Sequence, residues 1–583
     1  MEIIDTSRQK PLGWLQQLFL LLVLSYTYYN LAWVTEDAFI TFRSVDQLLA
    51  GHGPVWNLGE RVQVYTHPLW YGLLVLGTGL GAESYYFVLG LSYGLLLLLL
   101  GGLLWLVRRE ALNGYLALLL LLLLSLSRAF MDYSSSGLEN PLLHVLVLAY
   151  VLIYCHGIDP GKRFFRCTLI LGLAFLTRPD AVVLLAPAQL ALLGERWRSG
   201  QAWLKPAGWA LLPVLLWEVF SLFYYGSPIP NTALAKVNLG YEPITLLNNA
   251  YYYFRASFRF DPLTLVVILL AGVAGILSAE RRLRLLALGL LLQLVYITKV
   301  GGDYMLGRFL SAAFLLAVII LLKTLATARF HLRWRPLATA LVGWARRHPS
   351  AALLLYPLAL LAGGLLLFFL YQFHWPSNYL NSSEPQERLF LERDFMDERG
   401  YYINSLGLHY NHVHHRDYRD NSLRDQLAQF QQPQKLLLCN IGISVWSSPQ
   451  QHYVIDPLAL SEPFLARLPA RDGARVGHYE RAFPPGYLLS RMENRNRLQS
   501  PVLARLYDDV LLATQGELWS WARLGALWRL NSGHYKNLAD EFDRNAIGLE
   551  ELGYPPARNI TLKSCMGLTG PSPALPLAPY GTP

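Results

Sequence analysis

Long apolar segments recur along the first two-thirds of the chain. LLLLLL at 95–100 and LALLLLLLLSL at 116–126 are the most continuous. A helix that crosses a bilayer needs about 20 predominantly apolar residues. On that basis the pattern predicts a polytopic α-helical membrane protein with about 11 transmembrane helices, several of them short or interrupted by glycine. The predicted spans are Leu15–Trp33, Tyr85–Val107, Tyr115–Ser127, Leu138–Tyr154, Cys167–Thr177, Ala181–Leu193, Leu204–Tyr224, Pro262–Leu277, Leu285–Thr298, Arg308–Leu322 and Ala351–Phe373. Pro68–Leu80 is too short and predicts a helix on the membrane surface.

Basic residues set the predicted orientation, because short cytoplasmic loops are enriched in Lys and Arg. With a cytoplasmic N-terminus, every even-numbered span ends in a basic cluster, beginning with Arg108 and Arg109. The loop after Trp33, the turn before Glu139, the 226–261 loop and the 301–308 turn then face outward. An odd number of spans also places everything after Phe373 outside. The expected location is a bacterial inner membrane, with these outer parts in the periplasm.

The polar and apolar pattern changes after the last predicted span. Residues 1–373 are predicted to form the membrane domain, with an outer loop at 34–84. Residues 374–583 are polar and predict an extracytoplasmic α/β domain. Within it, QKLLLCNIGISVWSSPQQHYVID (434–456) reads as strands broken near Pro449. The Pro-rich end, GPSPALPLAPYGTP, predicts disorder.

Composition agrees with a membrane protein and argues against nucleic-acid binding. Hydrophobic residues make up 54% of the chain and charged residues 15%, where soluble domains carry about 25% charged residues. The net charge of +9 is explained by the cytoplasmic loops. The basic N-terminus and the first apolar segment resemble a signal peptide without a small-residue cleavage site, which predicts an uncleaved first span.

Four cysteines and a histidine cluster offer little support for a metal site. Cys155 and Cys167 flank a basic loop on the predicted reducing side. A disulfide between Cys439 and Cys565 requires an extracytoplasmic tail. The histidines of HYNHVHHRD (409–417) favour an exposed polar loop over a metal site.

The outer loop begins with two adjacent acids, Glu36 and Asp37, where the chain leaves the membrane. An acid pair that faces water, with Arg43 as its ion-pair partner, is one interpretation. The rest of the loop favours a binding site, because it combines turn-forming glycines with aromatic and hydrogen-bonding residues. The candidates in this loop are Arg43, His52, Trp56, Asn57, Glu60, Tyr65 and His67.

Other polar residues lie at the predicted outer ends of later spans. Glu139 is spaced as the third residue after Ser136 in a capping box, and that role is favoured. Arg178 and Asp180 interrupt an apolar run, where a charged residue costs about 2.5–3.5 kcal/mol to insert. A local ion pair between them is the simplest interpretation. Further candidates are Asn231, Lys236, Lys299, Asp303 and Arg308.

Several motifs together resemble a known family. TEDAFITFRSVDQLLAGHGPVWNLGERVQVYTHPLW is similar to the first outer loop of GT-C glycosyltransferases, and most of all to the branch that contains the mycobacterial terminal β-arabinofuranosyltransferase. SGLENPL, LTRPDA, PNTALAK and VGGDYMLGRF resemble later motifs of that branch in the same order. VIDPLALSEPFLARLPA and VGHYERAFPPGY in the tail are also similar. The resemblance spans nearly the whole chain.

The resemblance implies an enzyme that moves a sugar, by family arabinofuranose, from a polyprenyl-phosphate donor to an extracytoplasmic glycan or glycoprotein. An acid of the first outer loop acts as base in such enzymes. The family often has Asp where this chain has Glu36, so either Glu36 or Asp37 is the candidate. The donor phosphate would be bound by Arg178, Lys236, Lys299 and Arg308. Trp56 and Tyr65 would shape the sugar pocket. The sequence does not support a divalent metal or another cofactor. A lipid-linked-sugar flippase and a non-catalytic envelope assembly factor are the alternatives, although no internal repeat favours a transporter.

Overall fold

The computed structural model describes residues 12–112, 114–157, 159–237, 240–327, 395–420, 422–430, 432–474, 476–535, 538–544 and 575–579. The predicted span Ala351–Phe373 and Cys565 lie outside these residues. A helix covers each of the ten predicted spans that precede residue 328. The helices up to this point are α1 (Trp14–Leu31), α2 (Glu36–Leu49), α3 (Pro68–Gly79), α4 (Ser84–Arg109), α5 (Gly114–Leu126), α6 (Arg128–Asp132), α7 (Asn140–His156), α8 (Pro160–Thr177), α9 (Ala181–Arg198), α10 (Leu204–Tyr224), α11 (Asn231–Val237), α12 (Pro243–Phe260), α13 (Pro262–Ile276), α14 (Arg281–Val300) and α15 (Arg308–Thr327).

Fewer helices than predicted are long and apolar enough to cross a membrane alone. Within the described residues, four meet both criteria: α4, α10, α14 and α15. The bent pair α12–α13 makes a fifth if it counts as one span. The other predicted spans are shorter or more polar. α1, for example, ends in the polar sequence SYTYYNL. The protein is a multi-pass membrane protein, and a count of eleven remains a prediction.

Two helices occupy the segment predicted to be an outer loop. α11 and α12 fill most of residues 226–261, and α12 meets α13 at 110°. The bend lies at Asp261, because the following Pro262 lacks an N–H group and disfavours helical conformation in the residue before it. Asp261 then caps α13 by accepting a hydrogen bond from the Thr264 amide at 3.2 Å. α12 buries one face, including Tyr253 and Phe260, and exposes the other.

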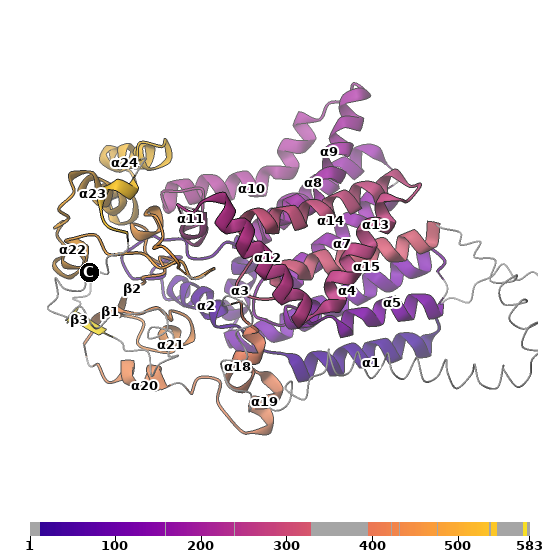
Figure 1. Cartoon of the computed structure of the whole chain (residues 1–583), viewed down its shortest axis with the longest axis horizontal. Helices are drawn as coiled ribbons and strands as arrows, with labels where there is room; N and C mark the ends of the chain where they lie inside the picture. Colours follow the sequence, from indigo (N-terminus) through magenta and orange to yellow (C-terminus); the bar gives the residue numbers. More distant parts are fainter. Residues whose placement is uncertain are drawn as a thin grey trace, which may run out of the picture.

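The remaining described residues form a mixed region beside one end of the helix bundle (Figure 1). Its elements are α18 (Glu398–Leu406), α19 (Leu408–Val413), α20 (Ser422–Ala428), β1 (Gln434–Leu437), α21 (Ile443–Trp446), β2 (Tyr453–Ile455), η4 (Leu465–Arg467), α22 (Tyr487–Glu493), α23 (Pro501–Gln515), α24 (Trp521–Asn531), η5 (Leu538–Glu541) and β3 (Leu575–Pro579). The sheet order is β2-β1-β3, with β2 parallel and β3 antiparallel to β1.

Two details of this region differ from the sequence-based expectation. Residues 443–446 between β1 and β2 are helical rather than extended. Residues 575–579 of the Pro-rich end form the edge strand β3. An edge strand tolerates proline, because one side of its backbone needs no partner.

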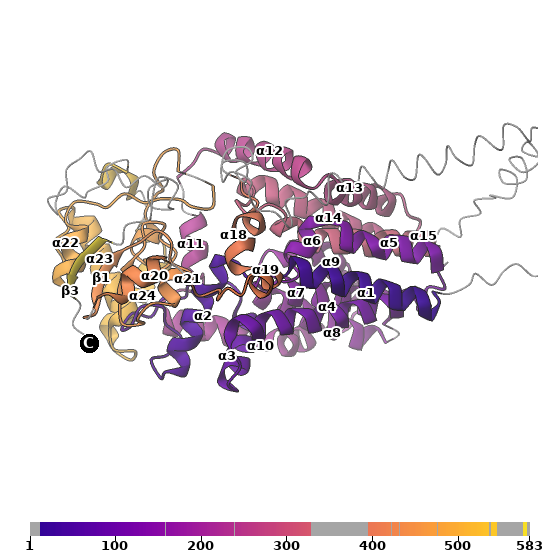
Figure 2. The same ribbon diagram turned by 90° about the horizontal axis from the view of Figure 1, so that it is seen from below.

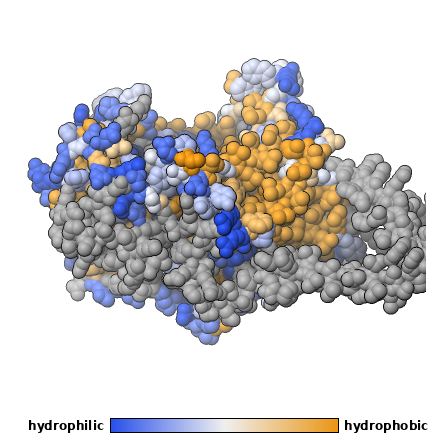
Figure 3. Space-filling model, in the orientation of Figure 1, coloured by the Kyte–Doolittle hydropathy of each residue, from blue (hydrophilic) through white to orange (hydrophobic). Residues whose placement is uncertain are grey.

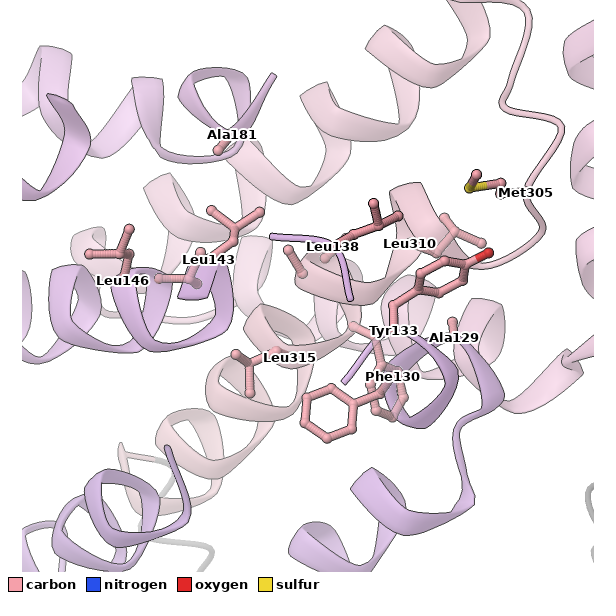
Figure 4. Packing of buried hydrophobic residues seen from close by; sticks show 14 of the residues in the cluster. Ala129, Phe130, Tyr133, Leu138, Leu143, Leu146, Ala181, Met305, Leu310 and Leu315 are labelled. Carbon is pink, nitrogen blue, oxygen red and sulfur yellow. The ribbon is translucent and has the colours of Figure 1, made fainter. Parts of the chain in front are cut away.

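Hydrophobic packing continues from the bundle into the region after residue 394. One buried cluster joins α1, α4, α7 and α15 to Phe395, Leu406, Leu436 and Tyr479. Figure 4 shows part of it, where Phe130 and Tyr133 pack near Leu310 and Leu315 below the turn that contains Met305. A second cluster joins Ala235 of α11 to β1, β2, α22 and α23. The core therefore holds one end of the helix bundle and the C-terminal region together.

The bundle exposes many apolar side chains, as a protein embedded in lipid requires. Figure 3 shows a continuous apolar surface over the helices, whereas the region on the other side is largely polar. Figure 2 shows α1, α4, α5 and α15 running side by side away from α18 and α19. The boundary between these two surfaces is where the cavity described next is found.

Candidate active site

A cavity of about 270 Å³ lies between one end of the helix bundle, predicted to be its outer end, and the C-terminal region. We call it the outer cavity. Its walls come from α2, the 64–67 loop, the start of α7, the α8–α9 turn, α11 and the α14–α15 turn. Leu460, Gly477 and Tyr479 close it from the C-terminal region. Of the predicted site residues, it is lined by Asp37, Tyr65, His67, Glu139, Arg178, Lys236, Asp303 and Arg308.

Asp37 is the acid of the adjacent pair that reaches the outer cavity. It lies in the first turn of α2, where the free N–H groups of the helix favour negative charge. Its side chain is half-buried, and Oδ2 accepts a hydrogen bond from the Tyr304 hydroxyl at 3.3 Å. The carboxylate therefore keeps free acceptor capacity that faces the cavity.

Glu36 points away from the cavity. Its Oε1 accepts a hydrogen bond from the backbone amide of Gly442, and 8% of the residue is exposed. Burial and then the neighbouring charge of Asp37 raise the pKa of Glu36 to about 8. A carboxyl group that is protonated near neutral pH and bonded to backbone is suited to positioning α2. The two acids that the sequence left equivalent thus have different environments.

A third acid approaches the same helix end from the C-terminal region. Glu398 accepts a hydrogen bond from the Thr35 hydroxyl at 2.5 Å, directly before the acid pair. Burial and the charge of Asp37 raise the pKa of Glu398 well above its usual range. Glu36 and Glu398 therefore place two carboxyl groups with raised pKa values beside Asp37.

Glu139 is the centre of a buried charge network. It lies 3.1 Å from Nδ1 of His67 and 3.1 Å and 3.2 Å from nitrogens of Arg178 and Arg308. Burial alone raises its pKa, but Arg308, His67 and Arg178 together hold it well below the usual range. The predicted capping role is wrong, because α7 begins at residue 140 and Glu139 makes no side-chain cap. Its carboxylate instead forms ion pairs with both arginines.

The three cations of the cavity differ in how far their donors are occupied. Arg178 donates hydrogen bonds to Asp180 through Nε and Nη2 and to Glu139 through Nη1. The predicted local ion pair is therefore present, and it leaves Arg178 little capacity for a ligand. Arg308 donates to Glu139 through Nη2 and to the sulfur of Met305 through Nη1, while its Nε has no hydrogen-bond partner among the described residues. Lys236 makes no ion pair or hydrogen bond with any residue that the structure describes.

Asp303 adds an unusual acid to the cavity wall. It is 6% exposed, and its Oδ2 has no hydrogen-bond partner in the described structure. Burial raises the pKa of Asp303, although Arg308 and Lys236 oppose that change. A buried polar atom without a partner costs about 1–3 kcal/mol, so a ligand hydroxyl would be a favourable partner for it.

Several predicted binding residues fasten the outer loop instead of lining the cavity. Arg43 is fully buried and donates to the carbonyl groups of Trp56, Val445, Gln450 and His452. It is not the partner of the acid pair. Trp56 packs against the Arg43 guanidinium, which lies 4.9 Å from the ring centroid.

Three further predicted binding residues also contact other parts of the chain: Asn57, Glu60 and Asn231. Asn57 makes two hydrogen bonds with the backbone of Val454 in β2, at 3.0 and 3.1 Å. Glu60 forms an ion pair with Arg491 at 3.2 Å. Asn231 donates to the carbonyl groups of Ala459 and Leu460, both at 2.9 Å.

His52 and Lys299 are exposed to solvent and do not line the outer cavity. The sequence placed them near the site, but the loop and the end of α14 turn them outward. No group of three or more His, Cys, Asp or Glu side chains that could hold a metal is present within the described residues. His409 and His412 instead contact the ring of Tyr29 in α1.

The structure adds residues that the sequence reasoning did not select. Tyr304 stands beside Asp303 in VGGDYMLGRF, and its position within a motif was an available signal. Thr41 lines the cavity beside His67, and Asp180, which the sequence assigned only to an ion pair with Arg178, lines it as well. Glu398 gave no signal, because only folding brings it to Thr35 from 363 positions away.

Comparison with known proteins identifies related membrane glycosyltransferases. Residues 67–225 match a family described as dolichyl-phosphate-mannose-protein mannosyltransferase. A terminal β-(1→2)-arabinofuranosyltransferase of Mycobacterium tuberculosis is 32% identical over 222 residues, which covers 35% of each chain. The resemblance to membrane glycosyltransferases is confirmed. The enzyme of the same name from Corynebacterium glutamicum is 28% identical over 327 residues, or 48% of this chain and 46% of that one.

The matched parts thus span less than half the length of these curated relatives. No solved structure matches the chain significantly. The family match ends at Tyr225, before α11 and the α14–α15 turn, so the contributions of Lys236, Asp303 and Arg308 come from the structure.

Proposed function

We propose that the protein is a membrane glycosyltransferase that moves a sugar from a polyprenyl-phosphate donor to an acceptor hydroxyl in the outer cavity. One observation supports this most directly: Asp37 shares a cavity at the outer ends of the helices with the available cations Lys236 and Arg308. A polyprenyl-phosphate sugar needs that arrangement, because its hydrocarbon stays in the bilayer while its phosphate and sugar reach the water boundary.

Asp37 is the proposed general base. A sugar hydroxyl is a weak nucleophile, and a carboxylate within hydrogen-bond reach can take its proton as the new glycosidic bond forms. The hydrogen bond from Tyr304 fixes the direction of the carboxylate. Glu36 and Glu398 position the start of α2 through Gly442 and Thr35.

Lys236 and Arg308 are the proposed phosphate-binding residues. When the bond between the sugar and the phosphate breaks, the phosphate gains negative charge. Cations that already point at that position then stabilise the transition state more than the ground state. Arg178 is a positioning residue in this scheme, because its donors are taken by Asp180 and Glu139. A phosphate leaving group needs no acid to protonate it, unlike the alcohol released by a glycosidase.

The donor sugar and the location are further parts of the proposal. Arabinofuranose is proposed because both curated relatives are terminal β-(1→2)-arabinofuranosyltransferases. An extracytoplasmic glycan or glycoprotein is the proposed acceptor. We place the outer cavity and the C-terminal domain, residues 374–583, in the periplasm of a bacterial inner membrane. Two observations support this side: Cys439 is disulfide-bonded, whereas Cys155 and Cys167 are free thiols.

Incubation of the purified protein with a panel of polyprenyl-phosphate sugars tests the proposal. Donor consumption by the wild type, and its loss in Asp37→Asn, is expected with polyprenyl-phospho-arabinofuranose. Turnover of a hexose donor alone would replace the proposed sugar and keep the reaction class. If no donor is consumed with any acceptor extract, while the folded protein moves lipid-linked sugars between leaflets, the enzyme proposal is wrong.

A further inference from the structure

An apolar stripe lies exposed along α24 in the C-terminal region. Trp521, Leu524 and Trp528 follow each other at spacings of three and four residues, so they share one face of the helix. They are 88%, 37% and 74% exposed, and Trp519, just before the helix, is 82% exposed. We call these four residues the tryptophan stripe. A soluble surface rarely exposes three tryptophans together without a partner.

Contacts of Trp519, Arg523 and Asn531 fix α24 to the outer end of α10. Arg523 is fully buried and donates to the carbonyl of Tyr224, the last residue of α10, at 3.1 Å. Asn531 donates to the carbonyl of Gly226 at 2.9 Å. The ring centroid of Trp519 lies 4.5 Å from that of Phe223. Figure 1 shows α24 next to this end of α10.

α10 is the span with the most exposed surface among the four long apolar helices. In its most apolar 18-residue window, 11% of the residues are buried. Leu215, Leu216 and Val219 are more than half exposed, and Phe220 and Leu222 continue this surface toward the outer end. An apolar helix of this length with such exposure faces lipid. The tryptophan stripe therefore lies next to the end of a helix whose exposed apolar surface suits contact with lipid.

We propose that α24 is an interfacial anchor whose tryptophan stripe sits in the headgroup layer of the outer leaflet. Tryptophan is enriched at membrane–water interfaces, since its ring is largely apolar while its indole N–H needs a polar partner. The hydrogen bonds of Arg523 and Asn531 connect α24 to the end of α10. The anchor holds the C-terminal region, and with it the wall formed by Leu460, Gly477 and Tyr479, at a fixed height above the bilayer. The proposal does not depend on the reaction assigned to the outer cavity.

An environment-sensitive label on the stripe tests the proposal in the full-length protein. Leu524→Cys, in a Cys155→Ser background, carries an NBD fluorophore and is reconstituted in phosphatidylcholine vesicles with and without doxyl-labelled lipid. Arg505→Cys on α23 is the matched control, because Arg505 is also exposed. It lies ten residues before Gln515, the last residue of α23, which is about 15 Å along the helix. Both variants must retain the melting temperature of the parent.

The expected result is a blue-shifted emission at position 524 and at least twofold stronger quenching by doxyl lipid there than at position 505. Equal, weak quenching at both positions overturns the proposal. So does a position-524 signal that responds to added soluble glycan, or to protein concentration, and not to doxyl lipid, because the stripe would then bind a carbohydrate or a second copy. A Trp521→Ser, Trp528→Ser variant gives an independent check. It should release the label at position 524 to a water-like emission without unfolding the bundle.

Discussion

The hydroxyl of Tyr304 donates a hydrogen bond to Oδ2 of Asp37 across 3.3 Å, which joins the start of α2 to the turn before α15. The same short stretch of the C-terminal region holds both partners. The amide of Met396 donates a hydrogen bond to the carbonyl of Tyr304 in this turn at 2.8 Å. Ten residues later, the carbonyl of Leu406 accepts from Val34 at 3.2 Å. Residues 396–408 therefore set the position of the proposed base relative to the proposed phosphate site.

Asp37→Asn should abolish most activity while Glu36→Gln should retain most of it. Asn cannot accept the acceptor proton, and loss of general base catalysis typically costs about 10²–10⁴ in rate. Glu36 is already protonated near neutral pH, so Gln matches its charge and still offers a carbonyl oxygen to Gly442. Initial rates of donor consumption, with melting temperatures as the folding control, measure both effects. Equal losses in the two variants would remove the distinction between base and positioning residue.

Gly442→Ala should lower kcat although it lies outside the cavity. A Cβ at this position would collide with the carbonyl oxygen of Glu36 and with its Oε1. A backbone atom cannot rotate away as a side chain can, so the start of α2 must shift and carry Asp37 with it. We expect at least a tenfold loss in kcat, because small misplacements of a reacting group are costly.

Gly473→Ala serves as the matched control for this change. It is a glycine of the same region whose added Cβ meets nothing within 4 Å. Its positive φ of 70° adds local strain, so its melting temperature falls slightly, while kcat should stay at the wild-type level. A normal kcat in Gly442→Ala would show that the outer cavity tolerates a shift of α2.

The sequence predicted the helices well and their roles less well. Periodicity and apolar runs located every described helix that was proposed as a span, since these signals are local. The sequence-based prediction placed α12 in a loop, because a helix with one buried and one exposed face has no continuous apolar run. The number of spans stays a prediction, because several of the predicted spans form helices that are shorter or more polar than a single membrane crossing requires.

For the site, the sequence identified most of the residues that line the cavity, but it did not show which role each of them has. Asp37, Lys236 and Arg308 were selected from residue type and position at helix ends. The difference between Glu36 and Asp37 depends on Gly442, which lies 406 positions from Glu36. Arg43 was selected as a binding residue, but four carbonyl groups occupy it, and carbonyl positions leave no trace in a sequence. Local patterns specify which groups are present, and long-range packing decides which of them remain free.

Lys236→Met and Arg178→Met should fail in different ways. Lys236 has no ion-pair partner among the described residues, so its loss should raise the donor KM at least tenfold with an unchanged melting temperature. Arg178 balances Glu139 and Asp180, both within 3.1 Å. Removing one partner of a buried ion pair typically destabilises a protein by about 3–5 kcal/mol. Thermal unfolding in detergent, alongside donor KM, separates the two results, and a stable but KM-defective Arg178→Met would instead assign Arg178 to the phosphate.

Glu36 should make the folded protein less stable as the pH rises from about 5 to 8. In the unfolded chain its carboxyl group ionises near its ordinary pKa, about 4.3. In the folded protein, burial keeps the proton bound until about pH 8. The folded state thus binds more protons in this window, so stability is fully present below pH 4.3 and falls as the pH approaches 8. Asp456 and Glu462, whose pKa values burial raises to about 7, act in the same direction.

Comparison with Glu36→Gln isolates this contribution from those of the other acids. Gln cannot ionise, so the difference in melting temperature between Glu36→Gln and the wild type should shift in favour of the variant as the pH rises. Above pH 8 the difference should become constant, because Glu36 is then ionised in both the folded and the unfolded wild type. Melting curves at half-unit intervals from pH 5 to pH 9 provide the measurement. A difference that does not change with pH would show that Glu36 is ionised in the folded protein, and it would then compete with Asp37 for the role of base.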